Sequence, residues 1–310
     1  MAIPFKKPRA YSNNPWTKEE EQRLLYLLWK GYSPSEIATY FPNRSKVSIK
    51  NKIRKMKIKY DLYGGGHRKE KYQLAEEWVR TIKPKTVLDG FAGRGNLTKI
   101  YLEHAKTVYA VEIKRNIFES LKANIEEYIG EEAEITDRNT YVIDNGEKRI
   151  VLINSDIKDA VYYLGGQGIT FDFIDLDPCG TPIPVIPLLP KILKEDGYLA
   201  ITFGDFHSYR FKRYDVLAKT VPILFDIRLN EGFIPRNIKN IEEFNKYLIV
   251  WVSILWILPQ DVHNFTYLEL IEKHLLGKKK ARGVLRALFR VKKGKSNAEI
   301  LQKIQDTLIS

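Results

Sequence analysis

From residue 84 onward, short apolar runs alternate with longer segments that carry apolar residues at helical spacing. Short apolar runs predict strands, and the longer amphipathic segments predict helices. This alternation is typical of an α/β domain, with a mostly parallel sheet covered by helices. Strands are expected at residues 86–90, 107–112, 149–155, 170–176 and 198–203, and helices at residues 95–104, 114–127, 157–164 and 184–194.

Further elements are expected at the end of this domain and beyond it. The turn Asp144-Asn145-Gly146 has hairpin chemistry and predicts a β-excursion before the third strand. The apolar residues 247–257 are expected to form an antiparallel edge strand. Beyond Phe265 the pattern predicts a basic helical tail, with a final helix from the capping box of residues 296–299. Its arginines lie four residues apart along one helix face, at Arg282, Arg286 and Arg290.

Residues 16–60 predict three short helices. Thr17 caps the first helix, and Ser33-Pro34-Ser35-Glu36 forms a capping box at the start of the second. The third is expected from about Lys46 to Lys59, with apolar residues facing inward. A basic stripe on its outer side consists of Lys46, Lys50, Arg54 and Lys57. Such a unit fits the major groove of a duplex.

The chain therefore divides into four expected parts. Residues 1–63 form the helical module, and residues 64–70 form a linker that begins with three glycines. Residues 71–262 form the α/β domain, and residues 263–310 form the basic helical extension.

Composition excludes several classes of protein. Of the 310 residues, 44% are hydrophobic, but no apolar run reaches the ~20 residues of a membrane helix, so no membrane partner is expected. A single cysteine, Cys179, excludes a disulfide framework and a multi-cysteine zinc site. The five histidines show no ligand spacing, so no metal is expected. The first nine residues lack the apolar region of a secretory signal, and a cytoplasmic location is expected.

The net charge of +13 is concentrated at the two ends of the chain. Residues 1–69 hold 16 Lys and Arg against five Asp and Glu, and residues 273–295 hold ten Lys and Arg and no acidic residue. The remainder is acidic. Two separate basic segments predict a nucleic-acid partner, because Lys and Arg neutralise phosphates. The alternative for the last segment is adsorption of a basic amphipathic helix to a membrane.

A glycine loop follows the first strand of the α/β domain, in residues 87–98. Its glycines, Gly90, Gly93 and Gly95, let the backbone turn sharply and approach a ligand. Glu112 lies 23 residues beyond Asp89, where a carboxylate can bind both hydroxyls of a ribose. The loop and this spacing fit an adenosine-containing cofactor, and a nicotinamide dehydrogenase has a similar loop.

The turn Asp177-Pro178 after the fourth strand favours a methyltransferase that acts on an exocyclic amine. The lone pair of such an amine is delocalised into the base, so acceptors are needed to hold its hydrogens and aim the lone pair at the methyl group. The Asp177 carboxylate and the Pro178 carbonyl are those acceptors, and proline fixes the direction of its carbonyl. Asp175 lies on the same face of the strand and is the third catalytic candidate, although a supporting role is the more expected one for it.

Residues 84–204 resemble the class I S-adenosylmethionine-dependent methyltransferases, with a Rossmann-like fold. The resemblance implies S-adenosylmethionine as cofactor. It also implies that Asp89, Gly90, Phe91, Gly93 and Gly95 surround the methionine part, that Glu112 holds the ribose with Ile113 against the adenine, and that Asp156 and Ile157 meet the adenine amine and its other face.

Within this class, the segment from Asp175 to Pro182 is similar to that of the tRNA guanine N2-dimethyltransferases. Cys179 replaces their aromatic residue, so Phe91, Phe203, Phe206 or Tyr209 is expected to stack on the base. Their asparagine-rich signature before the cofactor loop is absent. Its place is taken by residues 16–60, which resemble a Myb/SANT helix-turn-helix through Trp16-Thr17-Lys18-Glu19-Glu20 and Lys50-Asn51-Lys52.

The expected function is therefore an S-adenosylmethionine-dependent methyltransferase that modifies an exocyclic base amine in nucleic acid. DNA is slightly favoured, because a recognition helix suits duplex DNA. The alternative acceptor is a tRNA guanine N2 atom. An alternative of another class is a non-enzymatic DNA-binding regulator on a methyltransferase fold, and the N-terminal bundle has protein interaction as its alternative role.

Overall fold

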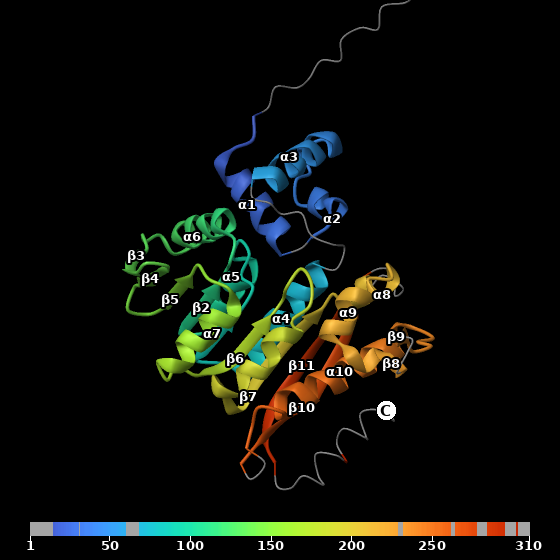
Figure 1. Cartoon of the computed structure of the whole chain (residues 1–310). Coiled ribbons are helices and arrows are strands. Elements are labelled where there is room, and N and C mark those ends of the chain that lie inside the picture. Colours follow the sequence, from blue (N-terminus) through green and yellow to red (C-terminus); the bar gives the residue numbers. More distant parts are fainter. Residues whose placement is uncertain are drawn as a thin grey trace, which may run out of the picture. The chain divides into compact units, whose positions relative to one another are not determined.

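The structure is a computed structural model, and it describes residues 15–30, 32–59, 68–228, 232–261, 264–277, 284–294 and 302. The chain divides into two compact units, Met1–Tyr63 and Gly64–Ser310 (Figure 1). The glycines at 64–66, Arg282 and the capping box at 296–299 lie outside the described residues.

The first unit contains three helices, as predicted. They are α1 (Lys18–Trp29), α2 (Pro34–Thr39) and α3 (Lys46–Lys59). Capping boxes start α1 at Thr17 and α2 at Ser33, because each hydroxyl accepts a backbone hydrogen bond that would otherwise be unmade. The inward residues of α3, Ile49, Ile53 and Met56, are buried in a core shared by all three helices.

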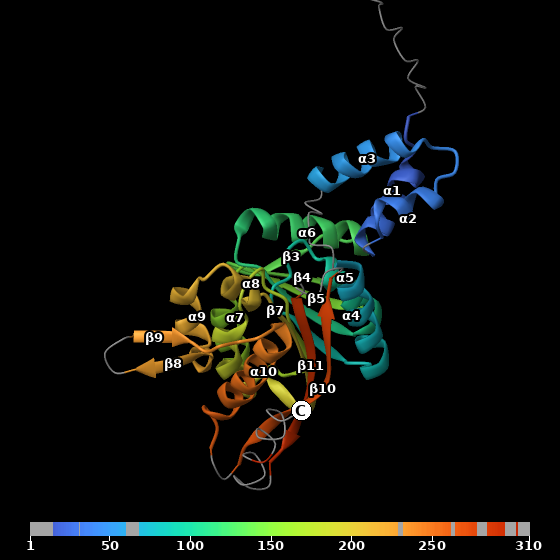
Figure 2. The same ribbon diagram turned by 90° about the vertical axis from the view of Figure 1, so that its right-hand side faces the viewer.

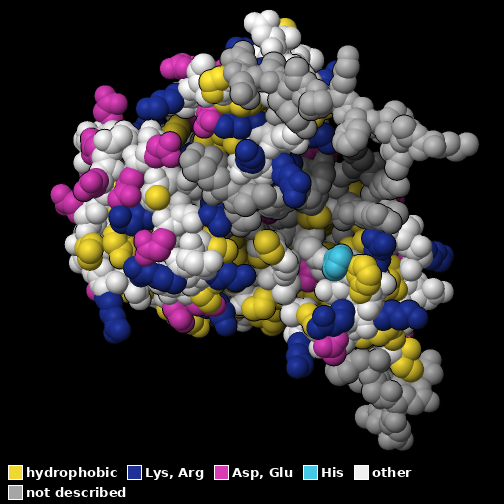
Figure 3. Space-filling model, turned by 90° about the horizontal axis from the view of Figure 1, so that it is seen from above, with side chains coloured by type: hydrophobic (Ala, Val, Ile, Leu, Met, Phe, Trp, Pro, Cys, Tyr) yellow, Lys and Arg dark blue, Asp and Glu magenta, His cyan; other side chains and the backbone are white. Residues whose placement is uncertain are grey.

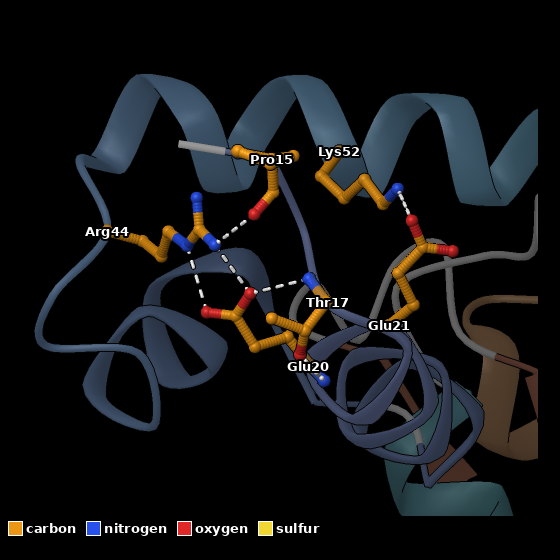
Figure 4. A network of polar contacts seen from close by, with 6 residues as sticks. All are labelled: Pro15, Thr17, Glu20, Glu21, Arg44 and Lys52. Carbon is orange, nitrogen blue, oxygen red and sulfur yellow. Dashed lines mark hydrogen bonds and ion pairs between the residues drawn. The ribbon is translucent and has the colours of Figure 1, made fainter. Parts of the chain in front are cut away.

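Ion pairs connect the helices of this unit (Figure 4). The Arg44 guanidinium donates to both carboxylate oxygens of Glu20, at 2.9 and 2.5 Å, and also to the carbonyl of Pro15 at 2.7 Å. Lys52 on α3 pairs with Glu21 on α1. These contacts hold α3 and the residues before it against α1. The side of α3 that faces away from α1 therefore belongs to a helix with a fixed position in this unit.

The second unit is built on a nine-stranded sheet in the order β10-β11-β7-β6-β1-β2-β5-β4-β3. The five central strands, from β7 to β5, run parallel, and an antiparallel hairpin extends each side. The strands are β1 (Thr86–Asp89), β2 (Thr107–Val111), β3 (Glu134–Asp137), β4 (Thr140–Asp144), β5 (Arg149–Ile153), β6 (Phe171–Leu176), β7 (Leu193–Phe203), β10 (Thr266–Leu276) and β11 (Val284–Lys293). A separate hairpin pairs β8 (Phe225–Arg228) with β9 (Gly232–Pro235). The predicted β-excursion is confirmed by the β4–β5 hairpin.

Helices cover both faces of the sheet (Figure 2). One face packs against α4 (Arg68–Ile82), α5 (Asn96–His104) and α6 (Arg115–Ile129). The other packs against α7 (Ile157–Gly166), the 3₁₀ helix η1 (Ile183–Lys191) and α10 (Ile241–Ile257), and α8 (Asp205–Arg210), α9 (Tyr214–Thr220) and η2 (Pro222–Leu224) complete this side. The α/β prediction is therefore confirmed. The expected helix at 184–194 is a 3₁₀ helix, because Pro187 and Pro190 within it lack the amide hydrogens of an α-helix.

The prediction of an edge strand at residues 247–257 is wrong. These residues form most of α10, which begins after Asn240. The Asn240 side chain accepts a hydrogen bond from the Glu243 amide. Helix α10 is apolar on most sides because it is largely buried, so its sequence lacks the polar stripe that marks a surface helix. No helix in the described parts of the chain is both long and apolar enough to cross a membrane.

The predicted basic helical tail is also wrong in its secondary structure. Residues 266–276 and 284–293 form β10 and β11, and β11 pairs antiparallel with β7 inside the main sheet. β11 is covered on both faces, so five consecutive residues from Leu285 to Phe289 are buried and the strand shows no alternation. The segment is therefore part of the sheet of the second unit and not a helical extension from it.

Candidate active site

The glycine loop lies at the carboxyl end of β1, between β2 and β6. In open α/β sheets, ligands bind at this edge, where the strand order reverses. The amide of Gly90 donates to the Asp175 carbonyl at 2.9 Å, and a Cβ at Gly90 would lie 2.8 Å from Leu176. Gly95 has φ +86 and a Cβ there would lie 2.8 Å from Leu121. Gly95 therefore requires glycine, whereas a side chain at Gly90 would press on the side chains of Leu176 and Ile157. Phe91 between them is half-buried.

Asp89 ends β1 with an incompletely satisfied carboxylate. The residue is fully buried, and its Oδ2 atom accepts a hydrogen bond from the Thr98 hydroxyl at 2.7 Å. Its Oδ1 atom is buried without a hydrogen-bond partner among the described residues. Burial raises the pKa of Asp89 to about 7. A buried acceptor atom without a partner is costly, so this atom is a candidate to accept a hydrogen bond from a bound ligand.

Glu112 follows β2 and closes the next side of the loop. Its Oε2 atom accepts from the Gly93 amide at 3.2 Å, and its Oε1 atom accepts from the Lys114 amide at 2.8 Å. Ile113 is 58% exposed beside it. The Asn154 amide donates to the carbonyls of both Glu112 and Ile113. The predicted ribose and adenine residues are thus on one edge of the sheet.

Asp156 and Ile157 lie at the start of α7. The Asp156 side chain caps this helix by accepting from the Lys158 amide at 2.8 Å. Ile157 is 6% exposed, and its Cδ1 atom would lie 3.2 Å from a Cβ at Gly90. The structure therefore brings Ile157 to the glycine loop, with Asp156 next to it in the chain.

The turn after β6 carries Asp177 and Pro178. The Lys71 ammonium, on α4, contacts the Asp177 Oδ2 atom at 2.5 Å, and the two side chains are 16% and 12% exposed. The Asp177 side chain thus points toward α4, whose next residue, Tyr72, is buried. Pro178 is half-buried, and Cys179 is exposed. Sequence reasoning missed Lys71, because 106 residues separate it from Asp177 and no motif surrounds it.

Asp175 is engaged inside the protein. Arg286 on β11 donates to its Oδ1 and Oδ2 atoms at 3.2 and 2.7 Å, and Tyr101 on α5 donates to Oδ2. Arg286 also donates to the Thr202 hydroxyl at 2.6 Å and lies 5.0 Å from the centroid of the Trp78 ring. Both Asp175 and Arg286 are fully buried. Asp175 is therefore bound within the protein, on the strand that directly precedes Asp177.

The burial of Arg286 corrects the expected nucleic-acid surface. This arginine was expected on an exposed helix face, but it forms an internal ion pair on a strand. Arg290 is partly exposed and pairs with Asp196 at 2.9 Å. On α3, Lys46, Lys50 and Arg54 are exposed, and Lys57 is half-buried.

The candidate rings for stacking on a base differ in accessibility. Phe203 is 2% exposed and belongs to the core, so it is not available. Phe206 and Tyr209 are half-buried and pack on Phe244, with ring centroids 5.3 and 5.2 Å from it. Phe91, Phe206 and Tyr209 therefore remain as candidates.

A group of potential metal ligands occurs on α4 and α5. Ligand atoms of Glu76, Glu103 and His104 lie within 4.8 Å of one another. The Nε2 atom of His104 is buried without a hydrogen-bond partner among the described residues, but Glu103 is exposed, and exposed acidic groups commonly gather without an ion.

The strand order, the glycine loop after β1 and the Asp-Pro turn after β6 together define a Rossmann-like methyltransferase fold. The family model of the N2,N2-dimethylguanosine tRNA methyltransferases matches residues 51–209, slightly more than half of the chain. The chain belongs to this family. A model of the Myb-like DNA-binding domain matches residues 13–57.

Curated relatives of this family include two tRNA (guanine(26)-N(2))-dimethyltransferases. The one from Thermoplasma volcanium is 31% identical over 133 residues, which are 43% of this chain and 32% of the relative. The one from Pyrococcus horikoshii is 32% identical over 129 residues, which are 41% and 32%. The matched part of the chain thus spans about a third of these relatives.

A solved structure has the same fold. It is a complex of Trm1 from Pyrococcus horikoshii with S-adenosyl-L-methionine, with a TM-score of 0.57 and 18% sequence identity. The superposition covers 75% of this chain and 58% of that protein.

Proposed function

We propose that this chain transfers a methyl group from S-adenosylmethionine to the exocyclic N2 atom of a guanine in tRNA. The observation that carries the proposal is the Asp177-Pro178 turn, braced by Lys71 and placed beside the glycine loop at the carboxyl edge of the sheet. Family membership supports the reaction class, and the relatives' names support tRNA guanine as the acceptor.

The glycine loop fits the cofactor. The unpartnered Oδ1 atom of Asp89 would accept from the amino group of its methionine part. A Cβ at Gly93 would have no atom within 4 Å, so the backbone there leaves room for close approach of the cofactor. Glu112 would hold the ribose hydroxyls, and the exposed Ile113 would cover one face of the adenine. Asp156 and Ile157 would meet its amine and its other face.

The residues of the turn position the acceptor amine. The bound cofactor supplies an activated methyl group, so most of the chain's contribution is orientation. The ion pair with Lys71 occupies the Oδ2 atom of Asp177, which leaves Oδ1 and the Pro178 carbonyl to accept the two N2 hydrogens. These bonds turn the nitrogen lone pair out of the base ring. The bound cofactor would supply the methyl carbon by cleavage of its carbon–sulfur bond, which leaves a neutral thioether. As that carbon bonds to N2, one N2 proton would pass to the Asp177 carboxylate.

The acceptor is the point at which the initial expectation changes. DNA was slightly favoured because of the helix-turn-helix module, but the comparisons with methyltransferases point to tRNA and none of those reported names a DNA acceptor. A Myb-like helix is compatible with RNA when it contacts phosphates, because phosphate contacts carry no base sequence. Lys46, Lys50 and Arg54 are the exposed cations of α3 that would make them.

The test is methyl transfer from labelled S-adenosylmethionine to tRNA and to duplex DNA in separate reactions, followed by mass spectrometry of the nucleosides. The wild-type chain is expected to form N2-methylated guanosine in tRNA. Asp177→Ala is expected to lower kcat by about a hundredfold or more, the range for a positioned proton acceptor, while cofactor affinity changes little. Asp215→Ala, on the exposed surface of α9, is the matched control and should retain activity.

Each other outcome has a defined meaning. Methylated DNA with unmodified tRNA would restore the DNA acceptor. Cofactor binding without transfer to any nucleic acid would favour the non-enzymatic regulator. Full activity of Asp177→Ala would refute the role of the turn.

A further inference from the structure

A second carboxylate lies beside the Asp177 turn and has no role in the mechanism above. Asp205 follows β7 as the first residue of α8 and is 3% exposed. The Thr181 hydroxyl hydrogen-bonds to it, but its Oδ2 atom is buried without a hydrogen-bond partner among the described residues. Burial raises the pKa of Asp205 to about 6. The group is therefore a buried acceptor, ionised at neutral pH, with one atom left unsatisfied.

The strand pairing places Asp205 at the acceptor side of the site. β7 runs parallel to β6, so both strands end at the edge that carries Asp177. Beyond the strands, the Gly204 amide donates to the Gly180 carbonyl at 3.2 Å, and Thr181 links the same turn to Asp205. The segment after β7 is thus tied to the turn after β6 at two successive residues.

Helix formation accounts for only part of the bonding of this carboxylate. The backbone amide of Asp205 itself hydrogen-bonds to it, but the Oδ2 atom has no partner among the described residues. Gly204, not Asp205, occupies the N-cap position of α8, and no side chain caps this helix. The helix has only six residues, so its dipole offers little to a buried charge. No lysine or arginine is among the groups that shift the pKa of Asp205. A buried polar atom that the fold leaves unpaired is a sign of a partner that arrives from outside.

We propose that Asp205 reads the guanine base by accepting the hydrogen bond from its N1–H group. This inference rests on the proposed function. On the Watson–Crick edge of guanine, N1–H lies next to the N2 amine, so a base whose amine is held by Asp177 and Pro178 presents N1–H to a neighbouring acceptor. Adenine has no hydrogen at N1, and a carboxylate facing that atom would be left unpaired. Asp177 thus selects the amine, and Asp205 selects the base that carries it.

The experiment compares guanine with 2,6-diaminopurine at the methylated position of the same synthetic tRNA. The analogue keeps the amine at C2 but has an acceptor at N1. Wild-type protein is expected to prefer guanine by about a hundredfold in kcat/KM, because the analogue leaves the carboxylate unpaired. Asp205→Asn offers either a carbonyl or an amide hydrogen, so the preference should fall at least about tenfold.

The control is Asp215→Asn on the surface of α9, which removes the same charge and should leave the preference unchanged. Folding of each variant is checked by its melting temperature and its affinity for the cofactor. A folded Asp205→Asn protein that keeps the wild-type preference would overturn the inference.

The wild-type protein gives a second test that does not depend on any variant. Equal kcat/KM for the two bases would show that no group reads N1, and would overturn the inference even if Asp205→Asn failed to fold. Failure of the proposed function looks different, because the wild-type chain would then methylate neither RNA.

Discussion

Four aspartates near the carboxyl edge of the sheet differ in what surrounds each carboxylate. Asp175 pairs with a buried arginine, and Asp177 pairs with Lys71. For Asp89 and Asp205, burial is the dominant influence, and it raises the pKa values to about 7 and about 6. The first two carboxylates are thus fixed by cations, whereas the other two keep unpaired oxygen atoms for which we propose ligand hydrogens.

Asp89→Asn tests this distinction through the pH dependence of stability. The folded-state pKa of about 7 lies above the ordinary value of 3.8, so the protonated form stabilises the fold. That contribution is fully present below pH 3.8 and is lost as the pH rises through about 7. Asparagine keeps an acceptor for Thr98 and cannot ionise. The difference in free energy of unfolding between Asp89→Asn and the wild type should therefore be about 3 kcal/mol more in favour of the variant at pH 8 than at pH 5.

The measurement is urea unfolding of both proteins at the two pH values, so that all other titrating groups cancel. Isothermal titration should show that Asp89→Asn binds S-adenosylmethionine at least about tenfold more weakly than the wild type. An unfolding difference that does not change with pH would contradict the assigned pKa.

At the scale of elements, β11 is tied to the strand that carries the acceptor turn. Arg286 reaches from β11 past β7, where it meets Thr202, to Asp175 on β6. Tyr101 brings α5 to the same carboxylate. One fully buried arginine therefore joins three strands, and the C-terminal hairpin is part of the structure that supports the site.

Arg286→Met should lower the free energy of unfolding by about 3 to 5 kcal/mol, because it leaves the Asp175 charge buried without its partner. The double variant Arg286→Met with Asp175→Asn removes both charges and should recover more than half of the loss. Urea unfolding measures both effects. A single variant within about 1 kcal/mol of the wild type would show that the pair is not a structural support.

The sequence predicted the elements whose hydrophobic pattern is marked by local signals. The glycine loop, the Asp-Pro turn and the caps at Thr17 and Ser33 each have a local chemical cause, and the structure contains them. The strand predicted at residues 247–257 was wrong because a continuous apolar run does not distinguish a buried strand from a buried helix. The Asn240 cap seven residues earlier was the available signal.

The contacts that complete the site are of another kind. Lys71 and Arg286 lie 106 and 111 residues from the carboxylates they bind, so only the folded sheet brings them together. The spacing of Arg282, Arg286 and Arg290 fits one face of a helix. The strand that holds Arg286 and Arg290 is buried over five consecutive residues, so its sequence lacks the alternation of apolar and polar residues that would have indicated a strand. Burial by tertiary structure overrode the local pattern.

At the scale of the whole molecule, the structure changes where nucleic acid is expected to bind. Of the C-terminal arginines in the described residues, one is buried and one pairs with Asp196, so this segment offers less positive surface than its charge indicates. Figure 3 shows Lys and Arg side chains over the visible face, with acidic side chains gathered along its left edge. The exposed cations of α3 in the first unit therefore become the main expected phosphate contacts.

Charge reversal on α3 tests whether these cations contact phosphates. In the full chain, Lys46→Glu, Lys50→Glu and Arg54→Glu together should raise the KM for tRNA at least about tenfold and leave kcat at saturating tRNA within about twofold. The logarithmic salt slope of tRNA binding should become shallower by up to about three, since each lost phosphate contact removes about 0.7 to 0.9. The matched control reverses three exposed lysines that precede β1, β2 and β7, at Lys85, Lys106 and Lys191. Fluorescence anisotropy over a salt series measures the slope. An unchanged KM and slope would assign the first unit to protein interaction, since a helix that bound phosphate could not lose these charges without weakening the complex.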